Sequence, residues 1–263
     1  MNQGLPLRFW RNIVSTIKSA RINHPINQFS TPEKLQTLLL VSRYKNRYIP
    51  IAFLSMALFH FTLFLNRKLK FYKLMGSGRN GTFDIRPDFN QWAIMVFFDS
   101  NQQPLMDIKP LSKMLLGKFI LGWWKVFNAE TRYFLLEPYA GHGTWDGRSF
   151  VDPKHKTADP EGKIAVLTRA TIRMSRLMHF WKAVPKTADQ LEANKGFIYS
   201  IGIGEIPFVK QATFSVWESI DDMKAFAYKK MAHQDVIRRT RKESWYSEEM
   251  FLRFKILREN EPL

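Results

Sequence analysis

The chain contains no cysteine among its 263 residues. This absence excludes disulfide bonds, thiolate ligands to zinc or haem iron, covalent haem attachment through a CxxCH motif, and a cysteine nucleophile. The chain also lacks an HExxH or HxxE motif and any paired-carboxylate constellation, so hydrolytic zinc chemistry has no support. The run GSGRNG at 76–81 has the GxGxxG spacing after a predicted strand, but it is a flexible turn that leads to another predicted strand and not to a helix, so the signature of a flavin or nicotinamide site is incomplete.

Acidic residues are scarce: 23 Asp and Glu stand against 40 Lys and Arg, for a net charge of +17. Such a balance suits nucleic acid, an anionic lipid surface or a merely solvated exterior. The basic residues are spread over the whole chain, without a zinc finger, an RNP-like strand or an isolated basic tail. We therefore expect no nucleic-acid partner. No signal-peptide pattern is present, and we expect a cytoplasmic protein that contacts an anionic membrane peripherally on its inner face.

The most regular stretch runs from residue 162 to residue 254 and alternates strand-like and helix-like periods. The predicted helices are 174–184 and 219–242, the second entered through Ser219 as an N-cap with Asp221 and Asp222 in its first turn. The predicted strands are 164–172, 197–203, 211–217 and 250–256. The order strand, helix, strand, strand, helix, strand is that of a ferredoxin-like unit.

The same order of elements occurs earlier in the chain, with strands at 35–42, 71–76, 91–98 and 132–138 and helices at 49–65 and 110–126. The predicted fold is therefore α+β, with two tandem ferredoxin-like βαββαβ units packed sheet to sheet around a pocket. The predicted parts are an N-terminal extension (1–34), a first unit (35–140), a connection (141–161), a second unit (162–257) and a tail (258–263).

Two apolar segments raise the question of a membrane. Residues 5–22 place Leu7, Trp10 and Val14 near one face, so the extension is either a basic amphipathic helix lying on a membrane or a segment packed on the domain. Residues 49–65 are the most apolar run of the chain, but a spanning helix needs about 20 residues. We therefore predict a buried helix there.

Alternation along the strands of the second unit separates two faces. Ala212, Phe214 and Val216 are apolar and are predicted to face the helices. The opposite face would line the pocket, with Arg169 as its only charge. Its other predicted members are Thr171, Ser200, Gly202, Gln211, Thr213 and Trp217. A solvent-exposed sheet face, or a polar interface between the units, explains the same pattern.

Among the six histidines, His233 is the strongest candidate ligand. On a helix over 219–242 it shares a face with Phe226 and Ile237, at the edge of an apolar stripe. A neutral imidazole there could bind a metal ion or haem iron. A lone helical histidine is more often structural, so both interpretations stand.

Five segments of the sequence carry a resemblance to a known protein family. They are FYKLMGSGRNGTF (71–83), GKIAVLTRATIR (162–173), FWKAVP (180–185), IGIGEIPFVKQATFSVW (201–217) and AFAYKKMAHQDVIRRTRKESWYSEEMFLRF (225–254). Together they resemble the spheroidene monooxygenase family of carotenoid biosynthesis, over roughly residues 35–256. They also resemble the wider group of dimeric α/β-barrel proteins. The extension at 1–34 and the apolar run at 49–65 depart from the family pattern.

The resemblance implies an oxidoreductase that introduces a keto group into a carotenoid with dioxygen as co-substrate and haem as cofactor. It makes an apolar carotenoid the expected substrate and an electron-donor protein a candidate partner. His233 is then the expected axial ligand to haem iron, and Arg169 the residue expected to pair with a propionate or to polarise bound oxygen. The alternatives are a haem peroxidase or dehydratase on the same scaffold, a cofactor-free monooxygenase, and a non-enzymatic protein that binds an apolar ligand or a membrane.

Overall fold

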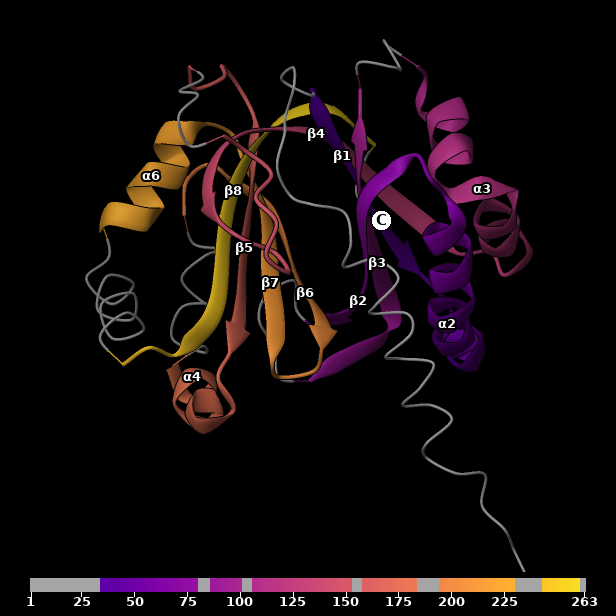
Figure 1. The fold of residues 1–263 in the computed structure, drawn as a ribbon, viewed down its shortest axis with the longest axis horizontal. Coiled ribbons are helices and arrows are strands. Elements are labelled where there is room, and N and C mark those ends of the chain that lie inside the picture. The colour runs from indigo at the N-terminus through magenta and orange to yellow at the C-terminus, as the bar shows by residue number, and fades with distance from the viewer. Residues whose placement is uncertain are drawn as a thin grey trace, which may run out of the picture. The chain divides into compact units, whose positions relative to one another are not determined.

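The computed structural model describes residues 34–79, 86–100, 106–152, 158–183, 194–229 and 243–260. Within these ranges, eight strands close an antiparallel barrel in the order β1-β3-β2-β6-β7-β5-β8-β4 (Figure 1). The strands are β1 (Leu35–Arg43), β2 (Leu69–Gly78), β3 (Pro87–Asp99), β4 (Glu130–Gly143), β5 (Ile164–Ile172), β6 (Phe197–Ile206), β7 (Lys210–Trp217) and β8 (Tyr246–Glu259). The first half of the chain supplies β4-β1-β3-β2 and the second supplies β8-β5-β7-β6, which confirms two tandem ferredoxin-like units.

The two four-stranded sheets meet at both edges. β4 pairs with β8 along nine residue pairs, whereas β2 pairs with β6 only at Gly76–Gly204 and Ser77–Ile203. Hydrogen bonding at these edges closes the predicted pair of sheets into one barrel.

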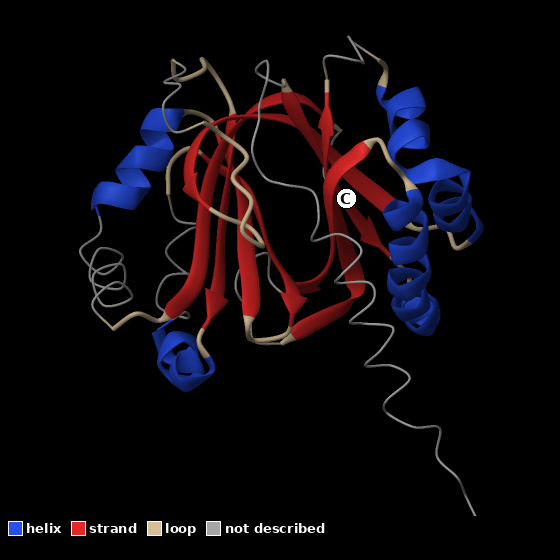
Figure 2. Ribbon diagram, in the orientation of Figure 1, coloured by secondary structure: helices blue, strands red, loops and turns tan. Residues whose placement is uncertain are grey.

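Helices lie outside the ring of strands (Figure 2). The helices α2 (Ile49–Leu65) and α3 (Ile108–Val126) cover the outer face of the first sheet. The helices α4 (Leu177–Ala183) and α6 (Ile220–Lys229) pack on the second. Before α6, the Oγ atom of Ser219 accepts a hydrogen bond from the backbone N–H of Asp222 at 3.1 Å, which confirms the predicted N-cap. Residues 230–242 of the predicted helix lie outside the described residues.

The helix α2 corrects one prediction. It buries a single stripe made of Ala52, Ser55, Phe59 and Leu63 and exposes most of its other apolar side chains, so it is not a buried helix. In the described part of the chain, Asn46–Leu65 is the one segment long and apolar enough to cross a membrane. Its two ends lead directly into β1 and β2 of the same sheet, so it lies against the barrel rather than leaving it.

The helix α3 is bent at Gly117, whose φ of 80° is left-handed. The bend frees backbone carbonyl groups in the preceding turn. The Asn66 side chain, directly after α2, donates to the carbonyls of Met114 at 3.0 Å and Leu115 at 2.8 Å. This contact joins the end of α2 to the middle of α3.

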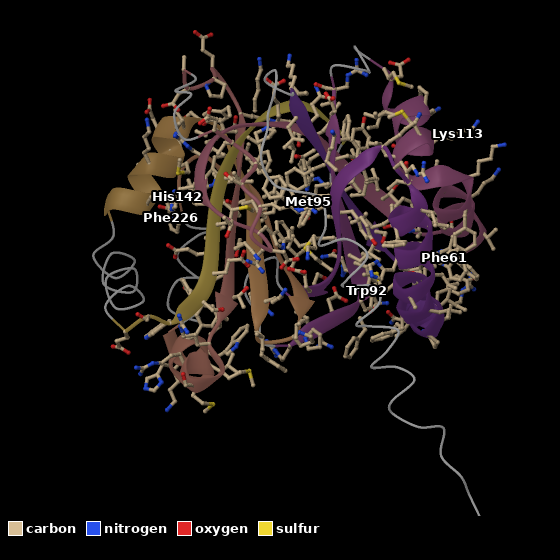
Figure 3. All side chains as sticks on the ribbon, in the orientation of Figure 1. Phe61, Trp92, Met95, Lys113, His142 and Phe226 are labelled. Carbon is tan, nitrogen blue, oxygen red and sulfur yellow. The ribbon has the colours of Figure 1, made fainter. Side chains whose placement is uncertain are left out.

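The interior of the barrel is filled by apolar side chains from both sheets, including Met95, Phe134, Leu167 and Phe214, each fully buried. Figure 3 shows Met95 within the ring of strands. The expected pocket between the sheets is therefore occupied by a packed core of described residues.

Candidate functional site

The sequence-based assignment of faces is right for one strand and wrong for two. In β5, Arg169 points into the barrel beside Leu167, as predicted for the pocket face, and Val166 points outward. In β7, Ala212, Phe214 and Val216 line the barrel interior rather than the helix side. In β6, Ile201 and Ile203 do the same, opposite Phe214 and Ala212.

The predicted pocket residues consequently separate into two groups. Arg169 and Thr171 belong to the interior face of β5, whereas the other predicted members belong to the outer face of the second sheet: Ser200, Gly202, Gln211, Thr213 and Trp217. The physical reason is closure of the barrel. A closed interior is the most deeply buried face, so it takes the apolar residues that an open sheet would turn toward helices. His233 lies outside the described residues.

Arg169 is not the only charge on the interior face. Its guanidinium forms an ion pair with Glu248 and lies 3.7 Å from Glu205 and 3.8 Å from Asp146. Lys73, from the first unit, forms ion pairs with both Asp146 and Glu205. The prediction that Arg169 is the only charge of its face is therefore wrong, because three carboxylates and Lys73 lie beside it. Its predicted role toward a propionate or bound oxygen stays a prediction.

This charged cluster anchors a loop that enters the barrel. Trp145 is fully buried in the interior core, and its Nε1 donates to Glu205 at 2.8 Å. Asp146 and Gly147, with φ of 50° and 75°, form a tight turn that pairs Trp145 with Arg148. Glu248 accepts from Thr144 Oγ1 at 2.9 Å and from the Gly147 backbone N–H at 2.8 Å. The loop thus closes one end of the barrel, with Trp145 held by its hydrogen bond to Glu205 and the adjacent Asp146 held by ion pairs.

The two acids that hold this loop are ionised at neutral pH. Burial alone would raise the pKa of Asp146, but hydrogen bonds and charge from Lys73 and Lys210 outweigh it and lower that pKa. For Glu248, burial is again outweighed, here by the Gly147 N–H, by Arg169 and by Thr144, so its pKa is also lowered. Lowered values mark these carboxylates as structural anions rather than as proton donors near neutral pH.

The outer faces of the two sheets differ in the size of their side chains. In the first sheet, large apolar residues fill the space beneath α2 and α3, among them Leu38, Leu40, Tyr72, Ile94, Val96 and Phe98. In the second sheet, β5, β6 and β7 carry small side chains in the middle of the same face, beside Phe251 on β8. We call these five residues the outer strip: Thr168, Ala170, Ser200, Gly202 and Thr213. Because the two halves share one strand order, the fold itself does not require this difference.

Two aromatic clusters flank the outer strip. Near α6, Trp217 packs against Phe226 with ring centroids 5.3 Å apart, together with Met223. Near α4, the cluster contains Phe180 and Trp245. Figure 1 shows α6 and α4 toward opposite ends of the strands of the second sheet, and Figure 3 shows Phe226 beside α6. The strip between them is a small-residue surface bounded by aromatic rings.

One atom of the outer strip lacks a partner. Thr213 Oγ1 is buried and, within the part of the chain that the structure describes, makes no hydrogen bond. A buried hydroxyl without a partner is costly, and such groups often mark a place where a ligand completes the bonding. Thr168, directly opposite Thr213 on β5, is exposed. Buried hydroxyls without a described partner also occur on the interior face, at Thr37 and Thr171. The small side chains of the outer strip, in contrast to the packed apolar interior, therefore make the outer strip the candidate ligand site.

Sequence analysis missed the members of the charged cluster other than Arg169. Lys73 carried a signal, because it lies between Phe71 and Met75 on the apolar face of a predicted strand. The Asp146-Gly147 pair was another, since it is a typical two-residue turn. Glu205 and Glu248 lie at strand ends far apart in sequence, and the strand order β6-β7-β5-β8 of the second sheet brings them to Arg169.

The fold defines the class of protein first. Two crystal structures of aldoxime dehydratase, one of them in complex with butyraldoxime, superpose with TM-scores of 0.54 and 0.52. Each covers 84% of this chain, and this chain covers 79% and 81% of theirs. At 9% identity this likeness concerns the fold alone, and it supports a dimeric α/β-barrel architecture.

Sequence comparison then shows the family. Spheroidene monooxygenase of Rhodobacter capsulatus is 35% identical over 193 residues, which is 72% of this chain and 76% of that protein. The Rubrivivax gelatinosus protein of the same name is 34% identical and covered over 68% of its length. The Cereibacter sphaeroides protein is 32% identical and covered over 56%. No protein-family model matches the chain. The chain belongs to the spheroidene monooxygenase family and is an oxidoreductase that acts with dioxygen.

Proposed function

We propose that this protein is a carotenoid monooxygenase that introduces a keto group into an apolar polyene. The observation that carries the proposal is the 35% identity to a spheroidene monooxygenase over 72% of the chain. The apolar and aromatic borders of the outer strip support a substrate of this kind. The alternative is a protein that binds an apolar ligand without changing it. Transfer of oxygen to the carotenoid distinguishes the monooxygenase from that binding protein.

The reaction of a monooxygenase has a fixed stoichiometry. One atom of dioxygen enters a C–H bond as a hydroxyl, and the other leaves as water after taking up two electrons and two protons. A second hydroxylation at the same carbon, followed by loss of water, yields the keto group. The reaction therefore needs an electron donor, and a donor protein is the partner we propose.

Haem is the cofactor that we propose for the outer strip. The residues present fit a flat apolar group: the strip is made of small side chains, aromatic clusters border it, and Thr213 Oγ1 can donate a hydrogen bond. When bound, haem supplies the activation of dioxygen at its iron. His233 is the residue that we propose would hold the haem iron. Within this proposal the outer strip orients the apolar ligand, and its aromatic borders keep water away from it.

The absorption spectrum tests the cofactor. We expect the wild-type protein, expressed with a haem precursor, to show a Soret band that His233→Ala loses or shifts. The matched control is His179→Ala, on α4, whose imidazole is exposed and whose substitution should leave the band unchanged. Full haem occupancy in His233→Ala would remove the ligand assignment. No Soret band in any preparation would leave a cofactor-free enzyme.

Thr213 offers a test of the outer strip itself. Thr213→Val should lower turnover about fivefold to tenfold, because the hydrogen bond that we propose Thr213 Oγ1 donates to the haem is lost. It should also raise the free energy of unfolding by about 1 kcal/mol, since a buried hydroxyl without a partner is removed. Turnover of carotenoid under labelled dioxygen and denaturant unfolding measure the two effects.

The control for this substitution is Thr37→Val. Thr37 is fully buried on β1, and its Oγ1 also lacks a hydrogen-bond partner among the described residues. It faces the barrel interior, opposite Phe97 and Leu136. Thr37→Val should therefore gain stability without losing turnover. Equal turnover in both variants would contradict the assignment of Thr213 to the ligand site.

A further inference from the structure

The solvent side of α2 is apolar along its whole length. Leu54, Leu58, Phe61 and Leu65 follow a helical spacing of four, three and four residues, so they form one stripe. This stripe lies opposite the buried stripe that packs on the barrel. Phe61 is 67% exposed and Leu65 is 59% exposed. Neighbouring positions add further exposed apolar side chains: Phe53 and Phe64 on α2 and Phe119 on α3. Isolated exposed apolar residues are ordinary, but a continuous helical stripe of them marks an interaction surface.

The charges carried by α2 and α3 themselves are of one sign. Neither α2 nor α3 contains an acidic residue. The helix α3 exposes Lys109, Lys113, Lys118 and Lys125, and Arg67 and Lys68 directly follow α2. Figure 3 shows Phe61 and Lys113 on the same side of the molecule. Nearby acids are already paired, Asp88 with Arg43 at 3.1 Å and Asp107 with Arg258 at 3.3 Å.

We propose that the α2–α3 face, defined by the apolar stripe of α2 and the exposed lysines of α3, docks on an anionic lipid bilayer. The apolar side chains enter the boundary between headgroups and acyl chains, and the lysines contact anionic headgroups. The helix lies in the plane of the interface, because both of its ends lead into strands of one sheet. This proposal does not depend on the reaction or on the cofactor.

The positive charge of the α2–α3 face argues against two other partners for it. A second copy of the chain, packed symmetrically on this face, would bring the lysines of α3 close to those of its partner, and like charges in apposition weaken association. The segment 1–33 contains Arg8, Arg11, Lys18 and Arg21 against a single acidic residue, so it does not complement the face either. An anionic membrane matches both the apolar stripe and the positive border.

Vesicle binding of the full-length protein tests the proposal. Vesicles of phosphatidylcholine alone are compared with vesicles that contain about a third phosphatidylglycerol, at low and high salt. We expect binding to the anionic vesicles that weakens with salt. Phe61→Ser combined with Leu65→Ser should weaken it about tenfold or more. Lys113→Glu should weaken it about fivefold or more.

The matched control is Met174→Ser combined with Met178→Ser. These methionines are 73% and 70% exposed near α4, on the other half of the barrel, and the change should leave vesicle binding intact. Full binding by the Phe61→Ser/Leu65→Ser protein would overturn the proposal, as would equal binding to neutral vesicles by every variant. Sedimentation velocity tests the remaining alternative, a dimer of this chain formed through the α2–α3 face. A wild-type dimer that this double substitution turns into a monomer, without vesicle binding by either protein, would assign the face to a second copy.

Discussion

Replacing Trp145 by Ala is expected to lower the free energy of unfolding by about 3–5 kcal/mol. The indole is fully buried in the barrel core and contacts Phe71, with ring centroids 5.6 Å apart. Its removal leaves a cavity in the packed interior and takes a hydrogen-bond donor from Glu205. Because the same loop carries Asp146, the ion pairs of that carboxylate with Lys73 and Lys210 should loosen as well.

Denaturant unfolding of the purified protein measures this effect. Trp181→Ala is the appropriate control, since Trp181 lies on α4, is only partly buried and donates to the Phe208 carbonyl at the molecular surface. We expect its cost to be well below that of Trp145→Ala. A loss under about 1 kcal/mol for Trp145→Ala would contradict the view that the loop closes the barrel end.

Replacing Thr168 by Trp is expected to reduce turnover on the order of a hundredfold with little change in stability. Thr168 is exposed at the centre of the outer strip and directly opposite Thr213, so an indole there would fill the space we assign to the ligand. Displacing a bound reactant by even about 1 Å can cost a hundredfold in rate. Exposed strand positions tolerate aromatic residues, so the fold should change by about 0.5 kcal/mol or less.

Local periodicity was enough to predict the elements of both units. The helix predicted at 49–65 is α2, and the strand predicted at 164–172 is β5, each with the same bounds. These segments carry their signal in adjacent residues: a long apolar run for the helix and β-branched side chains for the strand. The repeated order of elements then predicted the two ferredoxin-like units.

The side of each strand could not be predicted in the same way. Phe214 and Trp217 are both apolar and lie on opposite faces of β7, one in the barrel core and the other against α6. Alternation separates the two faces but does not say which one is interior, because that depends on closure of the barrel through β2–β6 and β4–β8. The charged cluster was hidden for the same reason, since Lys73 and Arg169 come from different units.

The difference between the halves explains why the site is assigned to the second sheet. Leu38 and Ile94 fill the outer face of the first sheet, whereas the outer strip presents hydroxyls and glycine. One half of the barrel thus holds a covered face whose helices expose an apolar surface, and the other holds the face of small side chains that we assign to the ligand.

The central claim is that oxygen transfer takes place at the outer strip and not inside the barrel. Turnover of a carotenoid under labelled dioxygen, compared between Thr168→Trp and Thr168→Ser at equal amounts of folded protein, tests it most directly. Serine keeps the hydroxyl and the space, so the account predicts near wild-type incorporation of label for Thr168→Ser and a loss on the order of a hundredfold for Thr168→Trp. Equal incorporation by the two folded variants would contradict the claim.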